Sequence, residues 1–239
     1  MRRIISLKNG VLLFLAALLL AACDEGKIYP EETPVDLGRT ATVNVRFKGL
    51  GAWPKKNYLS LVALGDNSDT PTQNKRFSKP VNADKTISVT LNNLKDDTRK
   101  ICIAVVSNGL DIVYTYYTYE VDKSGDNIVI DVDALELASY DRIQEQVFDA
   151  NCIACHGGST QVAGKLNLTR DKSYAALVDV EAPLSPDKKK YVDPGNPNNS
   201  YLPEILEENA YHKDMFNSTG KQEVLALIKT WIQEDAPNN

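Results

Sequence analysis

The stretch 138-ASYDRIQEQVFDANCIACHGG-158 marks a change in the periodicity of the chain. Before it, apolar and polar residues alternate, which is typical of half-buried strands. Within it, apolar residues recur at helical spacing, and either Ser139 or Asp141 can cap the start of a helix. The residues that share this spacing are Tyr140, Ile143, Val147 and Ala150. We therefore expect a β part before this stretch and a helical part after it.

Residues 40–133 are predicted to form a small Ig-like β-sandwich with about six or seven short strands. The run 86-TISVTL-91 alternates, whereas 100-KICIAVV-106 is almost wholly apolar and should be an inner strand. Asn108-Gly109 lies between two strand-like runs, which is the strongest short signal for a hairpin. The predicted first domain is therefore all-β.

Residues 139–236 are predicted to form a second, all-α domain, with the boundary near 134–139. Apolar residues at 224, 228 and 231 indicate a final helix, and Thr219 to Gln222 has the form of a capping box at its start. Short helices are expected at 173–180 and 200–209. The predicted fold class is thus two-domain, all-β and then all-α.

The first residues of the chain predict export. Arg2, Arg3 and Lys8 precede an apolar run at 11–20, which is shorter than the roughly 20 residues that span a bilayer. Small residues then lead to Cys23, so residues 1–22 are typical of a secretory signal peptide. The segment resembles a bacterial lipoprotein signal. That resemblance implies that Cys23 is lipidated and that residues 23–39 tether the first domain to a membrane.

The net charge of the chain indicates which classes of partner it can bind. The formal net charge is −5, and removal of residues 1–22, which carry three basic and no acidic residues, makes it −8. Such a chain is not suited to hold nucleic acid, and it favours a partner with a basic docking patch.

Cys152, Cys155 and His156 form the pattern C-x-x-C-H, for which three chemistries compete. A structural zinc ion needs four ligands, and besides the motif the mature chain offers only His212 and Cys102, which lies in the predicted inner strand. A redox dithiol usually follows a strand in a βαβ unit, whereas a helix precedes this motif.

The third chemistry is covalent haem attachment, for which C-x-x-C-H is the known pattern. Cys152 and Cys155 would form thioethers to the macrocycle, and His156 would bind the iron on the proximal side. Export agrees with this prediction, because bacterial c-type attachment takes place outside the cytoplasm. We therefore expect one covalent haem c in this chain.

Four segments strengthen the prediction: VFDANCIACHGG, GKLNLT, VDPGNPNNSYL and VLALIKTWIQEDA. With them, residues 139–236 resemble a class I-type c cytochrome domain, and most closely the planctomycete-type cytochrome c family. The resemblance covers 98 of the 239 residues, and its spacing of Pro194, Gly195, Pro197, Ser200 and Leu202 is more specific than C-x-x-C-H alone. It implies a cytochrome c-like fold with a single haem.

The resemblance also implies a methionine as distal iron ligand. Once Met1 is removed, Met215 is the one methionine left, and it follows His156 by 59 residues. Phe216 follows it, where the family commonly has proline. His212 lies three residues earlier, so it is an alternative distal ligand, and a vacant position is a third possibility. The group that orients the His156 ring stays open, although a backbone carbonyl is the usual kind of partner.

Together these features predict a membrane-anchored monohaem lipoprotein that transfers single electrons, and they favour an electron-transfer protein over a catalyst without deciding whether the chain is an enzyme. Two alternatives stay open. One is a haem peroxidase or gas-binding module with a labile sixth ligand. The other is a surface-binding or adhesion lipoprotein with an accessory haem domain. We expect a lipid-anchored location in the cell envelope, on the periplasmic or surface face of the outer membrane in preference to the inner membrane.

Overall fold

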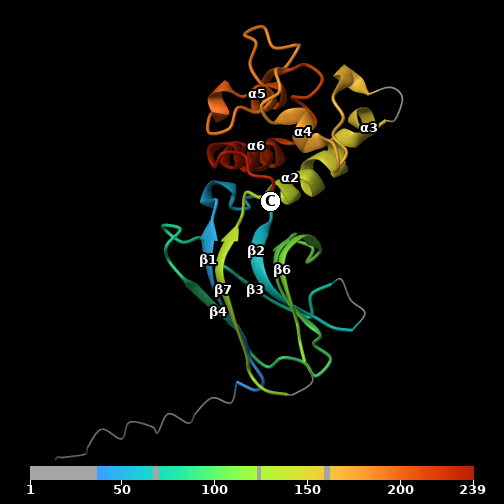
Figure 1. The fold of residues 1–239 in the computed structure, drawn as a ribbon. Helices are drawn as coiled ribbons and strands as arrows, with labels where there is room; N and C mark the ends of the chain where they lie inside the picture. The colour runs from blue at the N-terminus through green and yellow to red at the C-terminus, as the bar shows by residue number, and fades with distance from the viewer. Residues whose placement is uncertain (1–36, 67–69, 123–124, 159–161) are drawn as a thin grey trace, which may run out of the picture. The chain divides into compact units, whose positions relative to one another are not determined.

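The computed structural model describes residues 37–66, 70–122, 125–158 and 162–239 (Figure 1). The predicted signal peptide, Cys23 and most of the predicted tether lie outside these residues. Residues 37–239 form one compact unit that begins with two β-sheets. The strands are β1 (Ala41–Lys48), β2 (Tyr58–Leu64), β3 (Gln73–Arg76), β4 (Ile87–Leu91), β5 (Lys100–Val106), β6 (Ile112–Glu120) and β7 (Ile128–Glu136). Their order is β4-β1-β7 in one sheet and β3-β2-β5-β6 in the other.

The burial of the strands follows their sequence periodicity. In β1 every second side chain is buried, from Ala41 to Phe47, because one face of a strand meets the core and the other meets solvent. Strand β5 lies between β2 and β6 and is buried from Ile101 to Val106, which confirms it as an inner strand. Side chains of both sheets belong to one apolar cluster.

The strand pairings are partly local and partly long-range. β5 pairs antiparallel with β6, and the Ser107 N–H donates to the Asp111 carbonyl at 2.9 Å, so the predicted Asn-Gly hairpin is confirmed. β1 pairs with β7 in parallel, with a register irregularity between Val45 and Phe47. Local sequence patterns do not determine this pairing, because the two strands are the first and the last of the sheets.

The chain after β7 is helical in short pieces. α2 (Tyr140–Ile143) continues into a π-helix, η2 (Gln144–Cys152), and then into α3 (Ile153–His156). The remaining helices are α4 (Ser173–Leu177), α5 (Tyr201–Glu208) and α6 (Ser218–Gln233), and the 3₁₀ turns are η1 (Leu50–Ala52), η3 (Ala163–Lys165) and η4 (Pro197–Asn199). Ser139 caps α2, one of the two predicted possibilities. α6 is capped by Asn217, whose side chain accepts the Gly220 N–H, so its predicted start at Thr219 is wrong.

The predicted fold class, an Ig-like all-β domain followed by an all-α cytochrome c-like domain, is wrong. The structure has two β-sheets followed by a short helical region that is not a clear all-α cytochrome fold. Much of the chain between α4 and α5 is extended or turned, because its Pro and Gly residues interrupt helices. Isolated β-bridges hold this segment in place. These bridges join Val178 to Val192, Glu181 to Lys190, and Lys190 to Ser200. The parallel β1–β7 pair also departs from the antiparallel sheets of an Ig-like sandwich.

A buried arginine joins the helical region to the sheets. The Arg142 side chain is fully buried, and its Nη1 donates to the carbonyls of Ala52 and Leu137 and to the Tyr116 hydroxyl. Its Nη2 lies 3.5 Å from a carboxylate oxygen of Glu223 on α6. These contacts satisfy most of the hydrogen-bonding groups of the guanidinium, and residues of the sheets and of the helical region share one apolar core.

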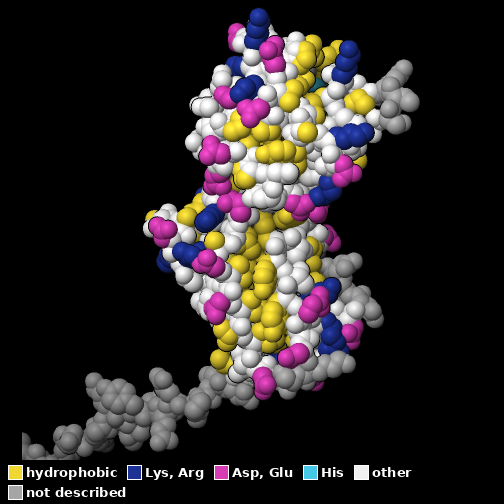
Figure 2. Space-filling view, in the orientation of Figure 1, with side chains coloured by type: hydrophobic (Ala, Val, Ile, Leu, Met, Phe, Trp, Pro, Cys, Tyr) yellow, Lys and Arg dark blue, Asp and Glu magenta, His cyan; other side chains and the backbone are white. Residues whose placement is uncertain are grey.

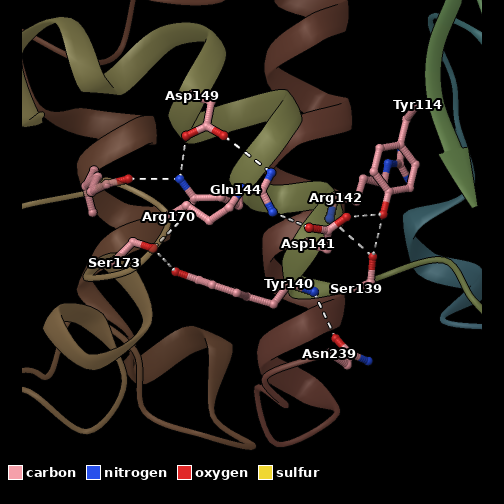
Figure 3. Close-up of polar contacts among 11 residues, drawn as sticks. Tyr114, Ser139, Tyr140, Asp141, Arg142, Gln144, Asp149, Arg170, Ser173 and Asn239 are labelled. Atoms are coloured by element: carbon pink, nitrogen blue, oxygen red, sulfur yellow. Dashed lines mark hydrogen bonds and ion pairs between the residues drawn. The ribbon is translucent and has the colours of Figure 1, made fainter.

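A second polar network fixes the start of the helical region (Figure 3). The Tyr140 hydroxyl donates to Ser173 Oγ at 2.6 Å, and Ser173 Oγ donates to Gln144 Oε1 at 2.5 Å. Gln144 Nε2 in turn donates to the Leu168 carbonyl at 2.9 Å and to Asp149 at 2.6 Å. The network ties α2 and η2 to α4 and to the segment that passes beside His156.

Among the described residues, no helix combines the length and the hydropathy that a bilayer span requires.

Candidate functional site

The helical region contains a cavity of about 540 Å³ that brings together every described residue predicted for the site. Cys152, Cys155, His156, His212 and Met215 all line it. Most of the other lining residues are apolar, including Val147, Phe148, Leu168, Tyr191, Leu202 and Leu206. Figure 2 shows hydrophobic side chains gathered on the surface of the helical region. The cavity is therefore suited to a largely apolar ligand that meets a few polar side chains.

The end of the helical stretch positions the C-x-x-C-H motif. The π-helix η2 ends at Cys152, and the single turn α3 presents Cys155 and His156. π-helical segments within helices often occur at functional sites. Gly157 follows directly, and a Cβ at this position would lie 2.6 Å from the Ile153 carbonyl oxygen. A residue without a side chain is thus needed for the chain to leave the helix immediately after the histidine.

The two thiols of the motif differ in their surroundings. Cys152 is buried and Cys155 is exposed, and neither forms a disulfide. Burial, reinforced by the neighbouring Cys155, raises the pKa of the Cys152 thiol to about 11. Cys152 is therefore a protonated thiol at neutral pH, whereas reactive dithiols and thiolate ligands of metals need a lowered thiol pKa.

The His156 ring is held by a backbone group. Its Nδ1 lies 3.0 Å from the carbonyl oxygen of Leu166. A carbonyl can only accept, so Nδ1 carries the proton and Nε2 of the neutral ring keeps its lone pair. The Leu168 N–H donates to the His156 carbonyl at 2.8 Å, which fixes the same two segments together. The structure thus supplies the backbone partner that the sequence left open.

The His212 ring is held in a similar way by a side chain. Its Nδ1 lies 3.1 Å from Asn209 Oδ1, which also accepts the Tyr211 N–H at 2.9 Å. The centroids of the His212 and His156 rings are 6.1 Å apart, and their planes are inclined by 32°. Burial, with a further contribution from His156, lowers the pKa of His212 and favours its neutral, ligand-competent form.

Met215 lies one turn further along the same loop. Its N–H donates to the His212 carbonyl at 3.1 Å, and 36% of the residue is exposed. Cys102 lies elsewhere: it is buried in β5 beside the Thr118 hydroxyl and does not line the cavity. Cys23 lies outside the described residues. In the described part of the chain, no group of three or more His, Cys, Asp or Glu side chains could hold a metal ion.

Several residues that shape the site were not predicted. Leu184, Tyr201 and Tyr211 line the cavity but are spread over loops and short helices, where no periodic pattern marks them. Asn209 could have been suspected, because it precedes His212 by three residues and an Asn side chain readily accepts a hydrogen bond within one turn.

No family model matches this chain, and the comparisons with curated proteins and with solved structures also found no match.

Proposed function

We propose that this protein holds one haem covalently at Cys152, Cys155 and His156 and serves in one-electron transfer. The observation that carries the proposal is the convergence of the three motif residues and a second imidazole on one apolar cavity. The C-x-x-C-H order is the pattern for c-type haem attachment, and a covalent macrocycle requires both thiols and the histidine at a single site.

The residues present fit such a group. Leu184 and Tyr211 at the cavity are among the most exposed large hydrophobic residues of the described chain, and a flat apolar group would cover them. The His156 and His212 imidazoles lie at the edge of an apolar space. This arrangement suits a metal whose remaining ligands come from a macrocycle. A protein-only zinc site would need four ligands from the chain.

Each chain residue has a defined task in this proposal. The Cys152 and Cys155 sulfurs would form the two thioethers, and His156 Nε2 would bind the iron. The Leu166 carbonyl keeps the proton on Nδ1 and holds the ring in orientation. The apolar walls would exclude water from the bound group and would thereby influence its reduction potential. When bound, the haem would supply a one-electron iron couple.

The leader sequence supports a place in the cell envelope, where such attachment occurs. Cys23 would carry the lipid that anchors the protein, with the outer membrane favoured, and the acidic mature chain would meet a redox partner through a basic patch on that partner. The β-sheets would then act as a spacer between the anchor and the haem-bearing region.

The test is to express the full chain in a bacterium that carries the c-type maturation system. We expect haem staining to remain on the chain after denaturing electrophoresis and to be lost in the Cys152→Ala/Cys155→Ala double variant. Cys102→Ala, which removes a buried thiol outside the cavity, is the matched control and should stain like the wild type. A wild-type chain that matures in this host with no covalent haem, or that binds zinc in its place, would refute the proposal.

A further inference from the structure

Two histidines lie on the candidate haem cavity at a separation that suits a shared metal. The ring centroids of His156 and His212 are 6.1 Å apart. Metal–imidazole bonds are about 2 Å long, so two rings that bind one metal ion from opposite sides have centroids about 6 Å apart. Each ring can turn about its metal–nitrogen bond, so the 32° between the planes is compatible with this arrangement.

Both rings also have the same nitrogen, Nδ1, engaged by an oxygen partner. Nδ1 of His156 faces the Leu166 carbonyl at 3.0 Å, and Nδ1 of His212 faces Asn209 Oδ1 at 3.1 Å. Both partners are oxygen acceptors, with the Asn209 side chain assigned by its acceptance of the Tyr211 N–H. The proton therefore sits on Nδ1 in each ring, and both Nε2 atoms keep a lone pair. A histidine that binds a metal almost always donates its other N–H to such an acceptor.

The competing ligand is less constrained. Met215 is 36% exposed, and its contact within the loop is made by the backbone N–H, which donates to His212. The thioether lies at the end of a flexible side chain, whereas the His212 ring is fixed by Asn209.

From these contacts we infer that His212 is the second axial ligand of the iron and that Met215 contributes only to the cavity wall. This inference rests on the proposed function. Two imidazoles of this chain would then hold the iron, a pair that would suit electron transfer and give a lower reduction potential than a histidine–methionine pair.

The test compares the full-length wild type with His212→Ala, Met215→Ala and His212→Met by absorption and electron paramagnetic resonance spectroscopy and by redox titration. Met215→Ala is the matched control, because it truncates a cavity residue of the same loop. We expect the wild type and Met215→Ala to share a low-spin bis-imidazole spectrum and His212→Ala to lose it. His212→Met should stay low-spin, gain a sulfur-to-iron charge-transfer band and show a raised potential.

Three results would overturn the inference: a sulfur-to-iron band in the wild type, a high-spin wild type, or loss of the low-spin spectrum in Met215→Ala alone. The wild-type spectrum decides between imidazole and sulfur even if a variant fails to fold. Haem staining keeps the two proposals apart. If the wild-type chain does not stain, the proposed function fails, whereas a stained chain with a sulfur or high-spin spectrum removes only the assignment of His212.

Discussion

Arg142 on α2 lies fully buried, with its Nη2 3.5 Å from a carboxylate oxygen of Glu223 on α6. The Glu223 carboxylate also accepts the backbone N–H groups of Lys55 and Lys56, at 2.9 and 2.7 Å. The pair therefore links α2, which leads into the C-x-x-C-H motif, to α6, and Glu223 links α6 to the loop before β2. Its hydrogen bonds offset the cost of taking the guanidinium out of water.

Arg142→Met should destabilise the protein strongly. The substitution leaves the Glu223 carboxylate and the carbonyls of Ala52 and Leu137 without the guanidinium, so we expect the free energy of unfolding to fall by about 3–5 kcal/mol. Denaturant titration followed by circular dichroism measures this loss.

The control is Arg170→Met. Arg170 is half-exposed and pairs with Asp141 and Asp149, so its loss should cost no more than about 1 kcal/mol. Equal losses in the two variants would show that Arg142 does not connect the sheets and the helical region in the way the contacts indicate.

Gly157→Ala should damage the exit from the motif helix. The added methyl group would lie 2.6 Å from the Ile153 carbonyl oxygen and 2.9 Å from its Cβ, and backbone must move to relieve this overlap. We expect a loss of about 1–3 kcal/mol in the free energy of unfolding. Ala154→Ser, on the exposed side of the same turn, serves as the control in the same thermal and denaturant melts. A Gly157→Ala variant as stable as the control would contradict the proposed role of the glycine.

Local sequence patterns predicted the elements better than their assembly. The alternation in β1, the apolar run of β5 and the Asn-Gly hairpin each depend on neighbouring residues, and each is present in the structure. The parallel pairing of β1 with β7 depends on contacts about 90 residues apart. The core contacts around Arg142 are equally non-local, so the change of period near residue 139 does not show how the sheets and the helical region contact each other.

The candidate site shows the same contrast between what local sequence determines and what tertiary structure determines. The spacing of Cys152, Cys155 and His156 is enough to mark them as candidates for one site, and the structure places all three at one cavity. The choice between His212 and Met215 depends on how their loop folds against the cavity. The two residues are only three positions apart, so their sequence spacing cannot determine which of them faces the proposed iron. The Leu166 carbonyl could not be predicted either, since every residue carries a carbonyl and only tertiary structure selects one.

The pH dependence of stability should contain a contribution from Glu234, at the end of α6. Burial, with further contributions from the neighbouring Glu136, raises the pKa of Glu234 to about 7. A raised folded-state pKa means that the folded protein favours the protonated acid. The stabilisation is therefore fully present below the ordinary glutamate pKa of about 4.5 and is lost as the pH rises to about 7.

Glu234→Gln should remove this dependence, because the amide mimics the protonated acid at every pH. Melting temperatures at pH 5 and pH 8 should be closer together in this variant than in the wild type, mainly through a gain at pH 8. The gain should be modest because the residue as a whole is exposed, so its charge is screened by solvent. Glu208→Gln, at the exposed end of α5, is the control and should keep the wild-type difference between the melting temperatures at pH 5 and pH 8. If Glu234→Gln also keeps that difference, Glu234 is not the source of the pH dependence.

Asn209→Ala tests how the His212 ring is held in the haem-loaded protein. The substitution removes the oxygen that accepts the His212 Nδ1–H at 3.1 Å, so the imidazole becomes a weaker electron donor and less firmly oriented. If His212 binds the iron, the reduction potential should rise and the low-spin resonance lines should broaden, while covalent haem staining stays at the wild-type level. Tyr211→Phe is the matched control, because it changes the neighbouring residue but keeps the ring that lines the cavity, the backbone N–H and the Asn209 side chain. A potential that moves equally in both variants would show that the loop as a whole, and not the Asn209–His212 hydrogen bond, influences the iron. An unchanged reduction potential in Asn209→Ala would show that His212 does not bind the iron.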